Sequence, residues 1–438
     1  TLALLFSLII APHFWFFLII VFLLQKSKLA WSKDLNALSI FIFSFLITLL
    51  EWFIPSQFPG HLGHTWLILR PYLGLVVWGG VPAFSFFSYW LCFWIVAKLQ
   101  KKKVDYLPVV GFTLFLFLNL AIPLQKEPLN GRLLNIRMIQ GNVGNYFKVN
   151  LEQQGGSALK EILSDFERIT LKNKENKPQL IIYPETVFPD ELSSEKLKNN
   201  TMPVPFFFQK ITDETQADIF FGGYDQVPYS PLQHFEDFYN AGFFLKAGQL
   251  QNVYHKRILI PFGETLPLGP LNKYLAPYVS NISYFAQGNV FPLFETSGHF
   301  SFISIICYEA LFSSFVRDYL QSVASPPDFI INLTNDSWYG DTAEPRQHLF
   351  LAKWRALEFA KPLLRSTNTG ISSVIYPDGS ESTQLALNTQ GALDVTLKLS
   401  TAHTTFFQRF GIGALVLLWL ILLFLIFIKN QVKKSEKP

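Results

Sequence analysis

Residues 302–309 read FISIICYE, a mostly apolar run that ends in Cys307, Tyr308 and Glu309. Such a run is typical of a buried strand. The end of a strand is where an α/β fold presents catalytic side chains, so Cys307 is a candidate nucleophile. A buried strand cysteine can also be inert packing, and this run alone leaves that alternative open. Residues 309–321 look helical, which puts Cys307 before a helix N-terminus, where the dipole lowers a thiol pKa.

Two other polar side chains stand in comparable places. Glu185 follows the apolar residues Leu180–Tyr183 and Pro184, and Lys256 precedes the string Pro261–Glu264. A carboxylate, an amine and a thiol can make and break an acyl-thioester, because the carboxylate deprotonates the thiol and the ammonium stabilises the oxyanion. The non-catalytic alternatives are a solvated loop carboxylate for Glu185, and a solvated basic patch or lipid-phosphate contact for Lys256.

The composition points to a membrane setting. Of the 438 residues, 50% are hydrophobic and 45 are Phe, and only 16% are charged, against about 25% in ordinary soluble domains. A net charge of +4 is too small to indicate nucleic-acid binding. Two cysteines form no disulfide framework, and Cys92, inside an apolar helix candidate, is expected to be a small buried hydrophobe.

Five apolar stretches are long enough for membrane spans, which need about 17 to 25 residues. They are Leu2–Leu24, Leu38–Ile54, roughly Val81–Ala97, Leu107–Leu124 and Ile412–Ile428. Three lysine clusters flank them, at residues 26–33, 98–103 and 429–437. Placing these clusters in the cytoplasm, by the positive-inside rule, puts residues 55–80 and 125–410 on the opposite side. The predicted organisation is therefore membrane helices over 1–124, a non-cytoplasmic catalytic domain over 125–410, and a last span with a basic tail over 411–438.

The segment 125–410 has the pattern of an α/β domain. Strands are expected at Leu133–Gln140, Leu180–Tyr183, Ile219–Gly222, Phe300–Ile306, Phe329–Leu333 and Ser372–Tyr376. Helices are expected at Ser157–Lys174, Leu311–Gln321 and Pro345–Lys361. Strands that alternate with helices imply sheets covered by helices.

The polar strings resemble those of a known family. Tyr183–Glu185, Lys256 with Pro261–Glu264, and Cys307–Glu309 are similar to the Glu-Lys-Cys triad of the nitrilase, or carbon–nitrogen hydrolase, superfamily. The chain resembles the bacterial apolipoprotein N-acyltransferases more closely. That resemblance runs through Met138–Asn142, Asn332–Asp341, Gln347-His348, Arg355–Glu358 and Arg365–Ile371, and it includes the membrane segments. It implies an α-helical membrane bundle joined to a nitrilase-like αββα sandwich. Members of that family usually have eight spans, so we expect three spans upstream of Thr1.

The resemblance also implies roles for individual residues. Glu185 would be the general base, Cys307 the nucleophile and Lys256 the oxyanion partner, helped by a backbone N–H such as that of Tyr308. Glu264 and Glu309 would hold Lys256 charged and oriented; Glu309 could equally stabilise a helix dipole. The pocket candidates are Asn335, Asp336 and Trp338.

Two apolar segments are expected in loops, Met202–Phe208 and Leu266–Tyr284. They either pack on their own domain or face the bilayer and admit an acyl chain, since large exposed apolar patches mark lipid or partner sites.

The expected activity is acyl transfer from a phospholipid, through a Cys307 thioester, to the amino terminus of a diacylglyceryl lipoprotein at the bacterial inner membrane, with the domain in the periplasm. Two alternatives remain: a membrane-anchored amidase that passes its acyl group to water, and a non-catalytic binding module. We expect no cofactor, no nucleic-acid partner and a monomer. The scattered His255, His299, His348 and His403 show no metal-site spacing.

Overall fold

A computed structural model describes residues 11–26, 36–128, 130–144, 156–228, 238–279, 282–400 and 403–435. The chain divides into two compact units. One contains the chain up to Gln125, the short segment Leu357–Phe359 and the chain from Thr404 onward. The other contains Lys126–Ala356 and Ala360–His403.

The first unit is helical. It contains α2 (Pro12–Lys26), α3 (Ala37–Phe53), η2 (Leu62–Leu69), α4 (Val76–Leu99), α5 (Leu107–Ala121) and α13 (Phe406–Ser435). Helix α4 packs against α3, α5 and α13. Aromatic side chains fill the contact between α3, α4 and α13, where Phe41, Phe86, Trp90 and Trp419 are buried together. Cys92 lies on the exposed side of α4, so its expected burial is wrong.

Glycine permits one close contact inside this unit. Gly80 interrupts the helical geometry of α4 with φ +55°, in the left-handed region that favours glycine. A Cβ atom at this position would lie 2.4 Å from the ring of Phe407 in α13. The helix therefore bends where α13 approaches it.

Two helices are long and apolar enough to span a bilayer, Val76–Leu99 and the Phe406–Leu425 part of α13. The other expected spans correspond to shorter apolar helices, Pro12–Leu24, Ala37–Phe53 and Leu107–Ala121. The start of the first expected span and Lys28, Lys33 and Lys437 of the lysine clusters lie outside the described residues.

The second unit contains two sheets. The larger sheet has the strand order β12-β1-β2-β4-β5-β6, and β3 pairs with β4. Its strands are β1 (Arg132–Gln140), β2 (Leu180–Ile182), β3 (Phe188–Leu192), β4 (Asp218–Gln226), β5 (Phe238–Lys246), β6 (Gln249–His255) and β12 (Gly391–Leu399). The smaller sheet has the order β11-β10-β9-β8-β7. Its strands are β7 (Phe294–Glu295), β8 (Ser301–Ile306), β9 (Phe329–Thr334), β10 (Leu363–Thr367) and β11 (Ser373–Ile375).

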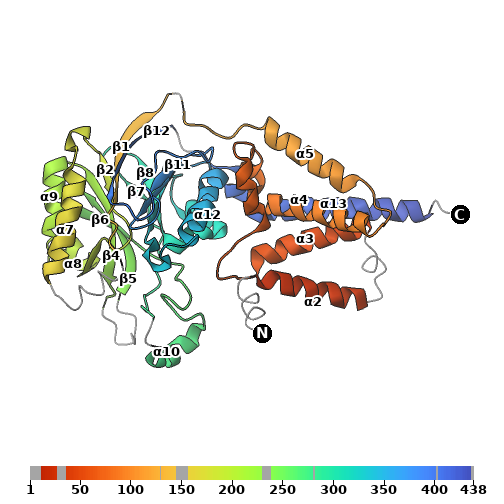
Figure 1. Ribbon diagram of the computed structural model, residues 1–438, viewed down its shortest axis with the longest axis horizontal. Coiled ribbons are helices and arrows are strands. Elements are labelled where there is room, and N and C mark those ends of the chain that lie inside the picture. Colours follow the sequence, from red (N-terminus) through yellow and green to blue (C-terminus); the bar gives the residue numbers. More distant parts are fainter. Residues whose placement is uncertain are drawn as a thin grey trace. The chain divides into compact units, whose positions relative to one another are not determined.

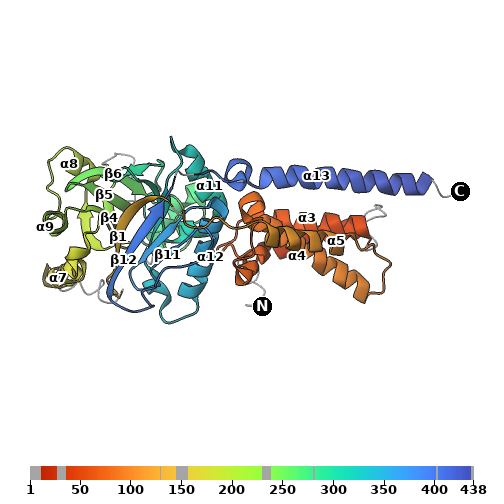
Figure 2. The ribbon, with the colours of Figure 1, turned by 90° about the horizontal axis from the view of Figure 1, so that it is seen from above.

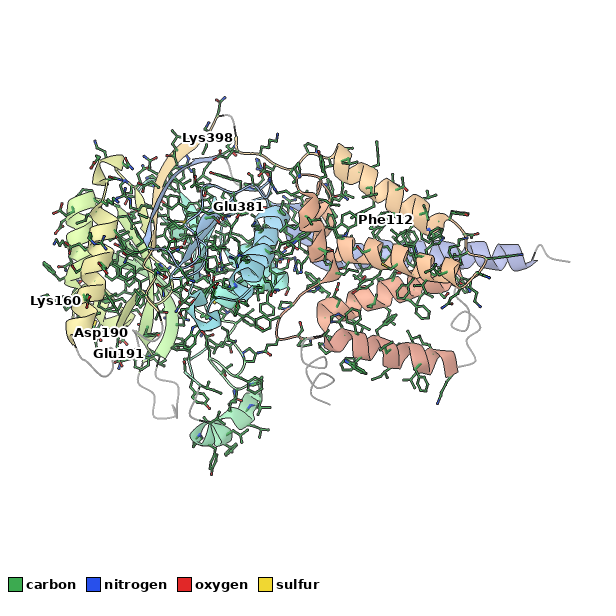
Figure 3. The ribbon with its side chains drawn as sticks, viewed as in Figure 1. Phe112, Lys160, Asp190, Glu191, Glu381 and Lys398 are labelled. Carbon is green, nitrogen blue, oxygen red and sulfur yellow. The ribbon has the colours of Figure 1, made fainter. Side chains whose placement is uncertain are left out.

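Helices cover the outer faces of both sheets. Helices α7 (Gly156–Leu171) and α9 (Phe206–Thr215), with the short α8 (Ser194–Lys198), lie on the outer side of the larger sheet (Figures 1 and 2). Helices α11 (Ser313–Ser322) and α12 (Glu344–Phe359) lie on the other side of the sandwich. Lys160, Asp190 and Glu191 project from the outer edge of this arrangement (Figure 3). The layers are thus helix, sheet, sheet, helix, as the sequence predicts.

An aromatic core joins the two sheets. Phe220 of the larger sheet contacts Phe294 and Phe302 of the smaller one, with both pairs of ring centroids 5.3 Å apart. Phe244 contacts the same two rings. Edge-to-face pairs of this kind contribute about 0.5–1.5 kcal/mol each beyond their burial. The neighbouring side chains Ile219 and Phe221 instead join the core beneath α7 and α9, because successive strand residues point to opposite faces.

The two apolar segments behave differently. Phe206 begins α9, and Phe207 and Phe208 are buried in the domain core, so the first segment packs on its own domain. The second segment includes α10 (Asn272–Leu275), and its apolar side chains are mostly exposed, up to 85% for Tyr278. Phe206 is exposed in the first segment, and the described residues of the second segment present several large apolar side chains at the surface.

Candidate active site

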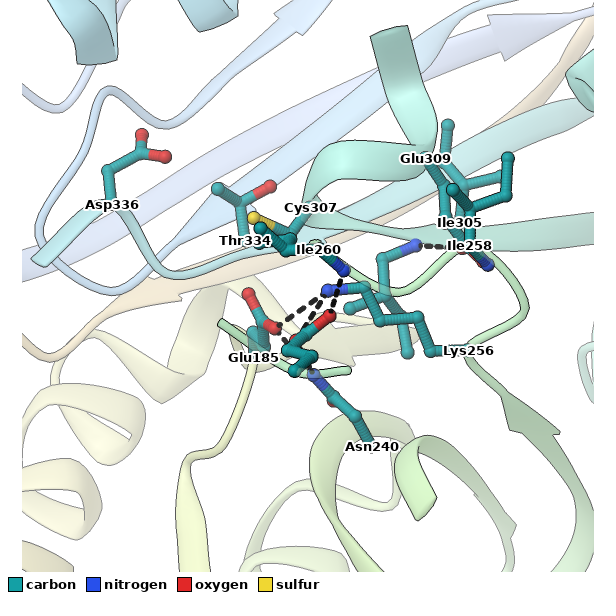
Figure 4. Close-up of polar contacts among 12 residues, drawn as sticks. Glu185, Asn240, Lys256, Ile258, Ile260, Ile305, Cys307, Glu309, Thr334 and Asp336 are labelled. Carbon is teal, nitrogen blue, oxygen red and sulfur yellow. Dashed lines mark hydrogen bonds and ion pairs between the residues drawn. The ribbon is translucent and has the colours of Figure 1, made fainter. Parts of the chain in front are cut away.

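Three buried side chains meet between the two sheets. Glu185 follows β2, Lys256 follows β6, and Cys307 follows β8. Figure 4 shows Glu185 and Lys256 beside each other, with the Cys307 sulfur near them. The larger sheet therefore supplies the carboxylate and the amine, and the smaller sheet supplies the thiol.

A close backbone approach places Glu185. The Gly222 N–H of β4 donates to the Pro184 carbonyl at 3.2 Å, and the Val187 N–H donates to the Gly222 carbonyl at 3.1 Å. A Cβ atom on Gly222 would lie 2.7 Å from the Glu185 Cα. Only glycine at position 222 lets the turn that carries Glu185 lie against β4.

Acceptors surround the Lys256 ammonium. Its Nζ lies 2.7 Å from Glu264 Oε1 and 3.8 Å from Glu185 Oε1. The Asn240 amide donates to the same Glu185 oxygen at 2.7 Å and to Glu264 Oε1 at 3.3 Å. Burial alone would lower the pKa of Lys256, but the charges of Glu264 and Glu185 outweigh burial and raise it. Lys256 is therefore an ammonium at neutral pH.

Cys307 is a neutral thiol in the resting site. Burial raises its pKa well above the ordinary value, the Glu185 charge raises it further, and Lys256 opposes them. The expected lowering by a helix N-terminus is wrong, because Cys307 opens only the five-residue 3-10 helix η6 (Cys307–Leu311). The thiol consequently needs a base. Its backbone has φ +50°, a left-handed conformation uncommon for a residue with a side chain.

The two supporting glutamates make different contacts. Glu264 bonds to the Lys256 ammonium, and its other oxygen accepts from the Ile260 N–H at 2.9 Å. Glu309 accepts from the Ile306 N–H at 2.7 Å, from the N–H groups of residues 257 and 258 at 2.6 and 3.0 Å, and from the Tyr254 hydroxyl at 2.8 Å. Burial raises the pKa of Glu309 to about 7 against these bonds. Glu309 thus connects the Cys307 turn to the loop that follows Lys256.

The remaining predicted residues lie at the end of β9. Asn335 is buried and accepts from the Asn368 amide at 3.1 Å, whereas Trp338 is 71% exposed. Asp336 begins η7 (Asp336–Tyr339) and is buried. The Tyr308 side chain is buried and packs edge-on against Phe312. An open pocket beside Asp336 is lined by Asn142, Gly144, Asp336, Ser337, Gly340, Thr369, Leu387 and Asn388.

Three polar residues of this region have no role predicted from the sequence. They are Asn240, which contacts Glu185, and His348 and Arg365, which both contact Asp336. His348 and Arg365 stand within strings that carry the family resemblance, and that was the available signal. Nothing in the sequence around Asn240 marks it. Across the ranges that the structure describes, no cluster of three His, Cys, Asp or Glu side chains is arranged to hold a metal ion.

Comparisons with known proteins identify the family of the chain. The carbon–nitrogen hydrolase family model matches residues 152–405. An apolipoprotein N-acyltransferase of Bdellovibrio bacteriovorus is 30% identical over 401 residues, which cover 88% of this chain and 72% of that protein. One from Haemophilus influenzae is 29% identical over 77% of this chain, which spans 64% of that protein's length.

Among solved structures, an amidase of the nitrilase superfamily from Nesterenkonia AN1 is 17% identical with a TM-score of 0.41, over 62% of this chain and 93% of the amidase. From the family model and the curated relatives it follows that the chain belongs to the carbon–nitrogen hydrolases and, among them, to the apolipoprotein N-acyltransferase family.

Proposed function

We propose that the protein transfers an acyl chain from a phospholipid to the N-terminal amino group of a diacylglyceryl lipoprotein, through a thioester on Cys307. The observation that carries this proposal is the meeting of a buried thiol, a buried ammonium and a carboxylate in one site of a chain that belongs to the family. Its relatives are named apolipoprotein N-acyltransferases, and the chain has the groups that a thioester route needs.

In the first half-reaction, Glu185 takes the proton of Cys307 and the sulfur attacks the ester carbonyl of the phospholipid. The Lys256 ammonium and the Tyr308 N–H stabilise the oxyanion, and a preorganised donor of this kind typically contributes about 2.7–4 kcal/mol in the transition state. The ester C–O bond then breaks, and the proton on Glu185 passes to the departing lysophospholipid oxygen. A thioester remains on Cys307.

In the second half-reaction, the acceptor's neutral amine attacks the thioester carbonyl. The same donors hold the oxyanion, the C–S bond breaks and an amide forms. The amine loses a proton to Glu185, which returns it to the sulfur. The enzyme is then restored to its starting state, as a ping-pong mechanism requires.

The exposed apolar segment supports a lipid donor. Leu268, Leu271, Tyr274, Leu275 and Tyr278 are all exposed on and around α10, and large exposed apolar patches mark lipid or partner sites. The segment follows Glu264 directly in the chain, so it adjoins the loop that holds the Lys256 ammonium. We infer that it contacts the bilayer and admits the acyl chain.

The proposed location is the bacterial inner membrane, with several helices crossing it. Two helices meet the length requirement for a span, and lysines follow α4 and occupy the end of α13. By the positive-inside rule these lysines face the cytoplasm. The catalytic unit then lies on the periplasmic side.

The test is the fate of the acyl group. With phospholipid and no acceptor, the enzyme should accumulate a long-chain acyl adduct on Cys307, detected by mass spectrometry and removed by hydroxylamine. Cys307→Ala should abolish the adduct, and the matched control Cys92→Ala should keep it.

Adding a diacylated lipopeptide with a free amino terminus should discharge the adduct and give a triacylated product, and a blocked amine should not. If the adduct is hydrolysed to free fatty acid at the same rate with and without the amine, the protein is a hydrolase. That outcome would support the membrane-anchored amidase instead.

A further inference from the structure

A buried histidine contacts the backbone of the nucleophile. His348 lies on α12 and is 3% exposed. Its Nε2 lies 3.2 Å from the carbonyl oxygen of Cys307, and its Nδ1 lies 3.0 Å from Asp336 Oδ1. A carbonyl oxygen can only accept, so the first contact is a hydrogen bond when Nε2 carries a hydrogen.

A buried ion pair fixes the other end of this arrangement. Arg365 Nη2 donates to Asp336 Oδ2 at 2.8 Å, and both side chains are fully buried. Arg365 Nη1 also donates to Asn332 Oδ1 at 2.8 Å. Burial alone would raise the pKa of Asp336, but Arg365 and His348 lower it, so Asp336 is an anion. The imidazole therefore stands between a rigid carboxylate and the Cys307 carbonyl.

Groups from several elements act on the imidazole. Asp336 faces it from η7, the Cys307 carbonyl from η6 and the Arg365 guanidinium from β10, while Glu344 on α12 lies near Asp336 and Arg365. Burial and the Arg365 charge lower the pKa of His348, and the Asp336 carboxylate and the Cys307 carbonyl only partly oppose them. Each ring nitrogen thus lies within hydrogen-bond distance of an acceptor, and a hydrogen on Nε2 points at the Cys307 carbonyl.

The carbonyl of Cys307 belongs to the same peptide plane as the N–H of Tyr308. A trans peptide is planar, so its C=O and N–H point in opposite directions and turn together. A bond that fixes the carbonyl therefore fixes the direction of the N–H. The left-handed φ of Cys307, +50°, is a strained backbone conformation. Such a conformation persists only where surrounding contacts fix it.

We propose that His348 is a positioning residue that orients the Cys307–Tyr308 peptide, and with it the N–H that binds the acyl oxyanion. The inference rests on the proposed acyl-transfer function, in which that N–H acts as an oxyanion donor. His348 does not touch the acyl group in this proposal. It acts through the peptide that joins the nucleophile to the next residue.

Two substitutions of His348 test separately its contact with the Cys307 carbonyl and its contact with Asp336. The amide nitrogen of His348→Gln can occupy the place of Nε2 and donate to the Cys307 carbonyl without depending on a ring proton. The amide nitrogen of His348→Asn can occupy the place of Nδ1 and keep the Asp336 contact, but it cannot reach the carbonyl. The full-length protein in detergent micelles serves for both variants.

Two reactions of Cys307 separate oxyanion binding from thiol activation. Acylation by phospholipid, or by a short-chain p-nitrophenyl ester, passes through an oxyanion. Alkylation by iodoacetamide displaces iodide at a saturated carbon and forms none. Misplacing one oxyanion donor should slow acylation in His348→Asn by about 10²-fold. Alkylation should stay at the wild-type rate, and His348→Gln should recover most of the acylation.

Acylation of His348→Asn at the wild-type rate would overturn the proposal. So would an equal loss of acylation in both variants together with slower alkylation, because that pattern reports general damage to the site. A wild-type enzyme that accepts the p-nitrophenyl ester but never phospholipid would remove the proposed acyl donor. The comparison of the His348 variants on the ester would still test the positioning role.

Discussion

Replacing Glu185 with Gln tests whether the buried thiol depends on this carboxylate. The substitution keeps the size of the side chain, and the amide oxygen that it introduces can still accept the bond from the Asn240 amide, which measures 2.7 Å in the wild type. The only essential loss is the ability to take a proton. We therefore expect a folded enzyme whose thiol must ionise unaided.

The size of the effect follows from the thiol. A cysteine with the reference pKa of about 8.5 is only about 3% thiolate at pH 7. Burial raises the pKa of Cys307 well above its ordinary value, so its thiolate fraction is smaller still. Removing the Glu185 charge offsets part of this rise, because that charge is the second cause of it. Acylation in Glu185→Gln should fall at least about 30-fold at pH 7.

The assay is the rate at which mass spectrometry detects the Cys307 acyl adduct, measured at several pH values. In Glu185→Gln the rate should climb about tenfold per pH unit, because thiolate is the reacting form below the thiol pKa. Glu191→Gln makes the same change at an exposed carboxylate and should leave the rate unaltered. A Glu185→Gln rate that equals the wild type, or that does not rise with pH, would refute this reasoning.

Three other outcomes follow from the structure. A Cys introduced at Lys102 should react with an impermeant thiol reagent only from the cytoplasmic side, and one at Asn199 only from the other side; labelling of both from one side would contradict the proposed topology. Replacing Leu275 and Tyr278 with Asp should impair acylation from phospholipid bilayers, because a charge in lipid is costly; unchanged activity in membranes would remove the lipid-contact role. Phe302→Ala should lower the free energy of unfolding by about 3–5 kcal/mol, measured by denaturant titration, since the ring is fully buried between the sheets.

The last prediction has a matched control. Phe206→Ala removes the same ring from a side chain that is 78% exposed. Substitutions at such surface positions usually change stability within about 0.5 kcal/mol. Equal losses for Phe206 and Phe302 would show that the ring of Phe302 contributes nothing specific to the sandwich.

The sequence predicts the central strands and helices well, because their signals are local. The strands that lead to Glu185 and Cys307 are short apolar runs, and both were predicted within two residues of their observed ends. Strands β3, β5, β6, β7, β10 and β12 were not predicted. Strand β6 buries only Val253 and Tyr254, β12 mixes buried with exposed residues, and β10 is only five residues long, so the local pattern is weak in each of them.

The candidate site likewise combines residues that local strings indicate with residues that they do not. Glu185, Lys256 and Cys307 stand in recognisable strings, but Asn240, which contacts Glu185, and His348, which contacts the Cys307 carbonyl, come from distant parts of the chain. The ionisation of the Cys307 thiol could not be predicted from sequence either. The helix N-terminus inferred beside Cys307 was wrong, because a short 3-10 helix precedes α11, and complete burial of the thiol depends on packing from both sheets.

The pairing of β1 with β12 bears on the order in which the enzyme matures. Arg132 is paired with Leu399, so the edge of the larger sheet closes only after nearly the whole domain has been synthesised. Contacts between such distant positions form slowly. Cys307 follows a strand of the smaller sheet, whereas Glu185 and Lys256 follow strands of the larger sheet. Until the two sheets pack together, the thiol therefore has neither the carboxylate nor the ammonium beside it. A thiol probe applied during refolding should therefore reach Cys307 until late in the process and lose access as acylation activity returns. The nascent protein would thus lack acyl-transfer activity until its final architecture has formed.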